Sequence, residues 1–224
     1  MLHLGCSPLC FWVRPDARKA KKPAADLPEQ IENLNFASGN IDFSQVMNVI
    51  NVIQKYYPED NDLRRILLRH STDVTRKALE VARRHPELPL NKQFLHDGAM
   101  LHDIGIFLTN APAIFCMGTE PYLMHGKLGA DLMRQEGLPD IARVCERHTG
   151  TGLTEEVIRA QNLPLPPGDY RPETLEEQVI CYADKFFSKT HLDRERTVEQ
   201  TIKSLQKYGQ ACVDQFEAWQ KLFG

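Results

Sequence analysis

The chain has 224 residues, of which 42% are hydrophobic and 25% are charged, and its formal net charge is −3. This size and apolar content suffice for one sizeable core. The charge balance argues against bulk affinity for nucleic acid or membranes. No apolar run approaches the roughly 20 residues that a membrane-spanning helix needs.

Six cysteines occur, and they form neither a Cys-x-x-Cys pair nor a disulfide-like cluster. Free cysteines in this pattern are typical of a reducing compartment. The sequence therefore predicts a cytoplasmic protein.

The first forty residues differ from the rest of the chain. A short apolar patch over 9–13 is followed by a basic stretch over 14–22, and prolines punctuate the segment. No Lys or Arg precedes the apolar patch, which disfavours a secretory signal peptide. We expect residues 1–40 to be a disordered tail or to lie upstream of the true start. Residues 41–224 are expected to form the folded domain.

Beyond residue 41 the apolar residues recur with a helical period, and no strand-like alternation extends over a useful length. Proline and glycine separate the segments. The expected helices cover 46–57, 62–84, a segment ending at His102-Asp103, a segment opening at His125, 138–148, a segment around 176–187, and 194–222. The sequence therefore predicts an all-α bundle.

Several polar residues occupy the apolar stripes of these helices. His70 lies between Leu67 and Val74 on one stripe. The same phase holds for His102, His125, His148 and Asp184. A lone histidine on an apolar face is more often a hydrogen-bonded core residue than a ligand, but a buried carboxylate is costly unless a cation or donor lies beside it. Together with Asp103, these are ligand types that a divalent metal binds, so we predict a metal centre inside the bundle.

The chain contains two His-Asp pairs, His96-Asp97 and His102-Asp103. Six residues of helix leave His96 about 120° away from His102 and about 9 Å along the axis. Both histidines cannot ligate one ion, because metal–nitrogen bonds are about 2.0–2.1 Å long. Only His102 follows a small, apolar run and precedes a glycine that can end the helix. We therefore expect His96 to lie on the surface or to support the ligands from behind.

The string Ala99-Met100-Leu101-His102-Asp103-Ile104-Gly105 resembles the signature of the HD-domain (HDIG-type) metal-dependent phosphohydrolases. The ordered set of His70, His102-Asp103, His125, His148 and Asp184 is similar to the six-ligand, two-metal branch of that superfamily. A lone His-Asp dipeptide is weak evidence, whereas the ordered set of six is strong. The resemblance covers roughly residues 63–189.

The resemblance implies an HD-domain helical bundle with a metal site in its core. His70, His102, Asp103 and Asp184 would hold one ion, and His125 and His148 a second, with Asp103 bridging. Because this ligand set contains no cysteine thiolate, the bound ion is expected to be iron or manganese, with cobalt or zinc as alternatives. Asp103 is also expected to be catalytic, by orienting a water molecule that the two ions share.

Three cations lie next to these ligands in the sequence and are candidates for binding a substrate phosphate: Lys127, Arg147 and Lys185. Each is equally well interpreted as a solvated surface charge. Many HD proteins place a lysine directly after the His-Asp-x-Gly run, where this chain has Ile106.

The resemblance implies a hydrolase that cleaves a phosphate ester or anhydride of a nucleotide, with a dinucleoside tetraphosphate as the best specific substrate. The alternatives are a phosphodiesterase of another nucleotide, a di-iron oxygenase, and a non-catalytic metal-bound sensor. The expected partner is a small phosphorylated substrate, with no nucleic acid and no membrane.

The last expected helix, 194–222, carries apolar residues at a spacing of three or four: Val198, Ile202, Leu205, Cys212, Phe216 and Trp219. This pattern is compatible with a seam for a homodimer. A terminal helix that closes the chain's own core is the favoured alternative.

Overall fold

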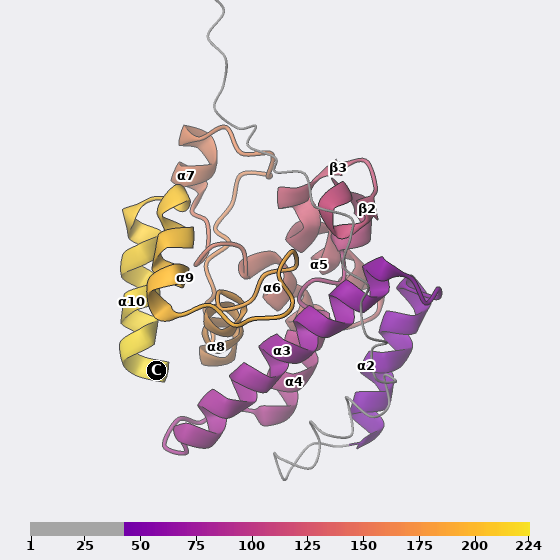
Figure 1. Cartoon of the computed structure of the whole chain (residues 1–224), viewed down its shortest axis with the longest axis horizontal. Coiled ribbons are helices and arrows are strands. Elements are labelled where there is room, and N and C mark those ends of the chain that lie inside the picture. Colours follow the sequence, from indigo (N-terminus) through magenta and orange to yellow (C-terminus); the bar gives the residue numbers. More distant parts are fainter. Residues whose placement is uncertain (1–42) are drawn as a thin grey trace, which may run out of the picture.

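The computed structural model describes residues 43–224, with side chains from residue 48 onward, so the expected tail over 1–40 lies outside the described residues. The described part is mostly helical, which confirms the all-α fold class (Figure 1). Its α-helices are α2 (Phe43–Tyr56), α3 (Asp62–Arg84), α4 (Lys92–Leu101), α5 (His125–Gln135), α6 (Pro139–Arg147), α7 (Glu155–Ala160), α8 (Leu175–Asp184), α9 (Val198–Leu205) and α10 (Gln210–Phe223). Within 43–224, no helix is both long and apolar enough to cross a membrane.

The long helix α3 shows how the sequence positions the centre of the molecule. Its N-cap is Asn61, whose side chain accepts a hydrogen bond from the backbone N–H of Arg64, so Asp62 is the first helical residue. Its buried face follows the predicted spacing and includes Leu67, His70 and Val74. The helix therefore carries a histidine into the interior on its apolar face.

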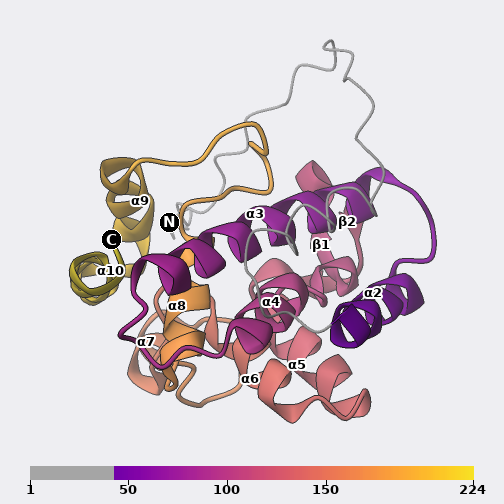
Figure 2. The same ribbon diagram turned by 90° about the horizontal axis from the view of Figure 1, so that it is seen from below.

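Helix α4 lies at the centre of the bundle. It packs against α3, α6 and α8, while α5 packs along α6. The two peripheral helices α2 and α10 cover opposite ends of this arrangement, near the two ends of α3 (Figures 1 and 2).

The apolar core consists of two clusters that meet along α3, α4 and α6. One cluster gathers around α8 and α10, and the other around α2 and α5. In α3, Leu68 belongs to the α2 side and Val74 to the α8 side, so His70 lies between the two clusters. The polar residues of the interior are thus placed at a junction of the core and do not interrupt either cluster.

A small sheet is present where the sequence predicted no strand. Strand β1 (Thr109–Ala111) pairs antiparallel with β2 (Cys116–Met117) and parallel with β3 (Glu120–Pro121). Strands of two or three residues are too short to show an alternating pattern, which is why the prediction missed them. Three single-turn 3₁₀-helices flank them: η1 (Ile106–Leu108), η2 (Pro112–Ile114) and η3 (Tyr122–Met124).

The expected single helix over 194–222 is wrong. The chain forms α9, a 3₁₀ turn η4 (Gln206–Tyr208) and α10, with Gly209 between the last two. Gly209 has φ 99° and ψ 166°, a backbone conformation that is essentially restricted to glycine. Its apolar pattern runs across the break because both helices bury side chains in the same core, including Leu205, Phe216 and Trp219. These side chains close the chain's own core, and dimerisation stays a prediction.

We expect Gly209→Ala to lower the free energy of unfolding by about 1–3 kcal/mol, because a Cβ strains this backbone conformation. Nothing lies within 4 Å of the added Cβ, so the cost is conformational rather than steric. Urea unfolding measures it. Gly168→Ala is the control, since its Cβ meets only the Tyr170 ring at ordinary contact distance. An equal loss in both variants would contradict the prediction.

Candidate metal centre

The six residues predicted as ligands come together at the junction of five helices. His70 comes from the middle of α3, and Asp184 is the last residue of α8. His102 and His148 are the C-caps of α4 and α6, and His125 is the first residue of α5. Residues separated by more than 100 positions in the chain are therefore delivered to one place. That they bind metal stays a prediction.

The carboxylate of Asp103 lies at the centre of this group and has no exposed surface. Its Oδ2 lies 3.1 Å from Nε2 of His70 and 3.1 Å from Nε2 of His102. Its Oδ1 lies 3.4 Å from Nε2 of both His125 and His148. Each oxygen faces its own pair of imidazoles, which is the arrangement that a carboxylate shared by two ions requires.

Asp184 joins the pair formed by His70 and His102. Its Oδ1 lies 2.9 Å from Nε2 of His70 and 3.6 Å from Nε2 of His102. We call these three residues with Asp103 Oδ2 the first half-site. His125 and His148 with Asp103 Oδ1 form the second half-site.

Three of the histidines are oriented by the same local bond. Nδ1 of His102, His125 and His148 lies 2.6–2.7 Å from the backbone carbonyl oxygen three residues earlier. A carbonyl only accepts, so each Nδ1 carries the hydrogen and each neutral ring presents a lone pair at Nε2. A hydrogen bond of this kind at the outer nitrogen is typical of metal-binding histidines.

The inner nitrogens show that these residues fit a cation. Nε2 of His125 lies 3.0 Å from Nε2 of His148, and Nε2 of His70 lies 3.3 Å from Nε2 of His102. In the second half-site both rings are protonated at Nδ1, so two lone pairs face each other. A divalent ion between them would turn this repulsion into ligation.

Burial and the carboxylates set the charge of the rings. Burial lowers the pKa of His125 to about 3 and also lowers the pKa of His148, so both rings are neutral at pH 7. Burial acts in the same direction on His102, but the Asp103 and Asp184 carboxylates outweigh it and raise its pKa to about 9. The first half-site therefore holds a proton that a metal ion would have to displace.

Lysines complete the centre, and the sequence identified only one of them. Lys185 Nζ lies 2.7 Å from Asp184 Oδ2 and donates a hydrogen bond to the His148 carbonyl at 2.8 Å. Lys189, which was not singled out, places Nζ 2.5 Å from Asp103 Oδ2. Lys189 lies beyond the end of α8, where helical phase gives no guidance. Its one signal was its closeness in sequence to Asp184.

The other two predicted cations lie elsewhere. Lys127 forms an ion pair with Asp131 at 2.5 Å on the outside of α5. Arg147 forms an ion pair with Glu173 at 2.6 Å and donates a hydrogen bond to the Arg171 carbonyl. Both are engaged by neighbouring groups outside the ligand cluster.

His96 is buried, with 1% of its surface exposed, so the expectation of a surface position is wrong. Its Nδ1 lies 2.7 Å from Asp97 Oδ1, and it is not among the converging ligands. The helix rotation separated it from His102 as predicted. Because α4 is surrounded by α3, α6 and α8, a face 120° away is also covered.

Two glycines allow the helices that carry the ligands to approach. A Cβ on Gly105 would lie 2.4 Å from the His125 carbonyl oxygen. A Cβ on Gly126 would lie 2.5 Å from the carbonyl oxygen of Cys145. That same Cys145 carbonyl accepts the hydrogen bond from His148. The spacing of α5 and α6 therefore controls the orientation of the second half-site.

Comparison with known proteins identifies the family. The model of the HD domain family matches residues 67–188, which is more than half of the chain, so the chain belongs to this family. No solved structure matches the chain.

Three relatives among curated proteins are similar in part of their length. A tRNA (cytidine(56)-2'-O)-methyltransferase of Picrophilus torridus is 34% identical over 144 residues, which cover 60% of this chain and 38% of the relative. The protein with the same name in Thermoplasma volcanium is 30% identical over 161 residues, 71% of this chain and 40% of the relative. An uncharacterised protein of Methanocaldococcus jannaschii is 31% identical over 144 residues, 63% of this chain and 76% of the relative. The chain thus matches about two fifths of each methyltransferase.

These relatives overturn the function expected from the sequence. Both named relatives are methyltransferases, which are transferases, whereas a nucleotide phosphohydrolase was expected. The physical reason for the error is that a set of histidines and aspartates selects a cation and its geometry. It does not fix which reaction the cation serves. The resemblance to the superfamily was correct, and the transfer of its hydrolase activity was not.

We expect Gly126→Ala to abolish metal binding at the second half-site and to reduce the metal content from two ions per chain to one. The added Cβ must push α5 away from the Cys145 carbonyl, which orients His148. Elemental analysis after dialysis against Mn²⁺ measures the content. Gly98→Ala is the control, because the nearest neighbours of its Cβ are side-chain atoms, the Cδ1 end of Ile180 at 2.7 Å and Cγ2 of Val144 at 3.4 Å, rather than backbone. Full metal content in Gly126→Ala would contradict the prediction.

Metal affinity should rise with pH up to about pH 9. Below the raised pKa of His102 the ring is protonated, and a metal ion must displace that proton. Each unit of pH between about 7 and 9 should therefore change the affinity by up to about tenfold. His125 and His148 are already neutral in this pH range, so they do not contribute to the pH dependence of the metal affinity. Calorimetry in buffers of different ionisation enthalpy should show about one proton released, and a flat profile would refute this.

Proposed function

We propose that this chain is a divalent-metal-binding HD domain that acts in the 2'-O-methylation of tRNA. The observation that supports metal binding is the division of the Asp103 carboxylate between two pairs of Nε2 atoms, at 3.1 Å and 3.4 Å. The observation that supports a role in tRNA methylation is the printed name of two relatives. Those names favour an RNA partner over the small phosphorylated substrate expected from the sequence.

The ligand set proposed for two ions is the one expected from the sequence: His70, His102, Asp103 and Asp184 for one ion, and His125 and His148 with Asp103 for the other. Its nitrogen and oxygen atoms favour iron or manganese, with cobalt or zinc as alternatives. We also propose that the protein acts in the cytoplasm. The spacing of its six cysteines does not resemble that of a disulfide framework, and free cysteines are typical of a reducing compartment.

The residues of the centre have separable tasks. The backbone carbonyls of Ala99, Tyr122 and Cys145 hold three imidazoles with their Nε2 atoms turned inward. Lys185 fixes Asp184 and the end of α6 at the same time. A bound divalent ion would supply a fixed positive charge that attracts and polarises an oxygen, such as that of a phosphate or a ribose hydroxyl. Such oxygens are abundant in a tRNA.

Asp103→Asn should test the proposal, because it preserves shape and removes the shared negative charge. We expect metal affinity to fall by at least the ~10–100-fold that loss of a supporting partner costs in metal sites. We also expect tRNA binding by the purified chain, measured by fluorescence anisotropy, to depend on Mn²⁺ in the wild type and to lose that dependence in the variant. Methyl incorporation at cytidine 56 with S-adenosylmethionine as donor is measured in parallel.

Asp131→Asn is the matched control, since this aspartate pairs with Lys127 outside the ligand cluster. It should leave metal content and tRNA binding unchanged. Wild-type protein that binds two ions but does not prefer tRNA to unstructured RNA would overturn the tRNA role alone. Failure of the wild type to bind any divalent ion would overturn the whole proposal.

A further inference from the structure

The Asp103 Oδ2 atom has three nitrogen neighbours at short range. Nε2 of His70 and Nε2 of His102 each lie 3.1 Å away, and Nζ of Lys189 lies 2.5 Å away. We propose that Lys189 is an internal competitor of the first metal ion, and that its ammonium leaves Asp103 when the ion binds. This inference rests on the metal binding proposed above and is independent of the role in tRNA methylation.

The competition follows from charge and distance. An ion held by His70, His102 and Asp103 would lie about 2.0–2.2 Å from each ligand atom. With Lys189 at 2.5 Å from the same oxygen, the two cations would be less than about 5 Å apart. Asp103 is fully buried, so water and salt screen this repulsion poorly. Asp103 Oδ2 can therefore bind either the metal ion or the Lys189 ammonium at close range, but not both at once.

The position of Lys189 allows it to withdraw. It lies on the segment between α8 and α9, which contains no helix and crosses in front of α6 and α8 in Figure 1. Beyond Lys189 this segment is mostly exposed. A lysine side chain has a flexible four-carbon stem, so its ammonium can reach solvent without movement of the helices.

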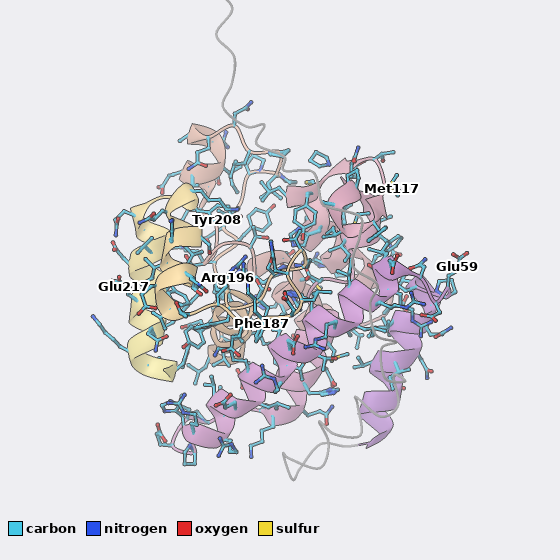
Figure 3. All side chains as sticks on the ribbon, in the orientation of Figure 1. Glu59, Met117, Phe187, Arg196, Tyr208 and Glu217 are labelled. Carbon is cyan, nitrogen blue, oxygen red and sulfur yellow. The ribbon has the colours of Figure 1, made fainter. Side chains whose placement is uncertain are left out.

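The far end of the segment is tied down and would hold the backbone in place during this exchange. Glu195 forms ion pairs with Lys77 at 2.5 Å and Arg76 at 3.2 Å on α3. Arg196 donates hydrogen bonds to the carbonyls of Lys185 and Phe187 (Phe187 and Arg196 are labelled in Figure 3). The change on metal binding is therefore expected at the Lys189 side chain rather than across the whole segment.

Binding of Co²⁺, followed by its visible absorption at pH 7, tests the competition. We expect Lys189→Met to bind Co²⁺ at least tenfold more tightly than the wild type. Lys189→Arg keeps the charge and should stay close to the wild type. Lys55→Met is the matched control, because it removes one positive charge that pairs with Glu136 away from the ligand cluster. It should leave the affinity unchanged.

Thermal unfolding gives a second test, because the difference in melting temperature between Lys189→Met and the wild type should depend on whether metal is bound. Without metal, Lys189→Met should melt below the wild type, because Asp103 loses its buried partner. With saturating Co²⁺, the difference should vanish or reverse, because tighter metal binding stabilises the folded state. A deficit of the same size in both conditions would overturn the proposal.

Amine labelling of the wild-type protein tests displacement directly and needs no variant. Lys189 should react with acetic anhydride faster in the presence of Co²⁺ than after chelation, as measured by mass spectrometry of its peptide. Lys77, held by Glu195, serves as the internal reference. Slower labelling with metal, or equal or weaker Co²⁺ binding by Lys189→Met, would show that Lys189 supports the metal and would overturn the inference. A wild type that binds no Co²⁺ would instead overturn the metal site itself.

Discussion

The structure depends on one buried carboxylate. Asp103 has no exposed surface, and an ionised carboxylate in such a place is unstable unless positive groups or donors surround it. Burial raises its pKa, but His102 and Lys189 outweigh burial and hold that pKa well below the ordinary value. Asp103 is therefore charged at neutral pH, and the surrounding helices are arranged to supply the compensating groups.

The ends of the helices perform two tasks with one hydrogen bond. The last carbonyls of an α-helix have no partner within the helix. In α4 and α6 one of these carbonyls, from Ala99 and Cys145, accepts the Nδ1–H of the histidine that caps the same helix. The bond satisfies the helix end and turns Nε2 toward Asp103. Ligand orientation is thus a local consequence of where each helix stops, and the glycine contacts between helices only need to set the distances.

Helical phase explains which parts of this arrangement could be predicted from the sequence. The positions of His70 and Asp184 follow from the apolar stripes of α3 and α8, and the ordered set of six candidate ligands indicated the family. Features outside long helices left no periodic signal. The three short strands and the position of Lys189 fall in such regions. At Gly209 the apolar pattern instead continues across the break, so periodicity alone predicted one helix where there are two. The reaction was also out of reach, because ligands that select a cation are compatible with more than one chemistry.

The positive neighbour that the buried Asp103 carboxylate requires is supplied by a residue far from it in the sequence. The position directly after the His102-Asp103-Ile104-Gly105 run is the fully buried Ile106, which packs in the α2-side cluster and offers no charge. The ammonium beside Asp103 comes from Lys189, more than eighty residues later in the chain. The buried carboxylate requires a positive neighbour, and any element that borders it can provide one. Because the segment beyond Lys189 is mostly exposed, this cation is attached less firmly than one carried by a buried helix, which is the basis of the competition with a metal ion proposed above.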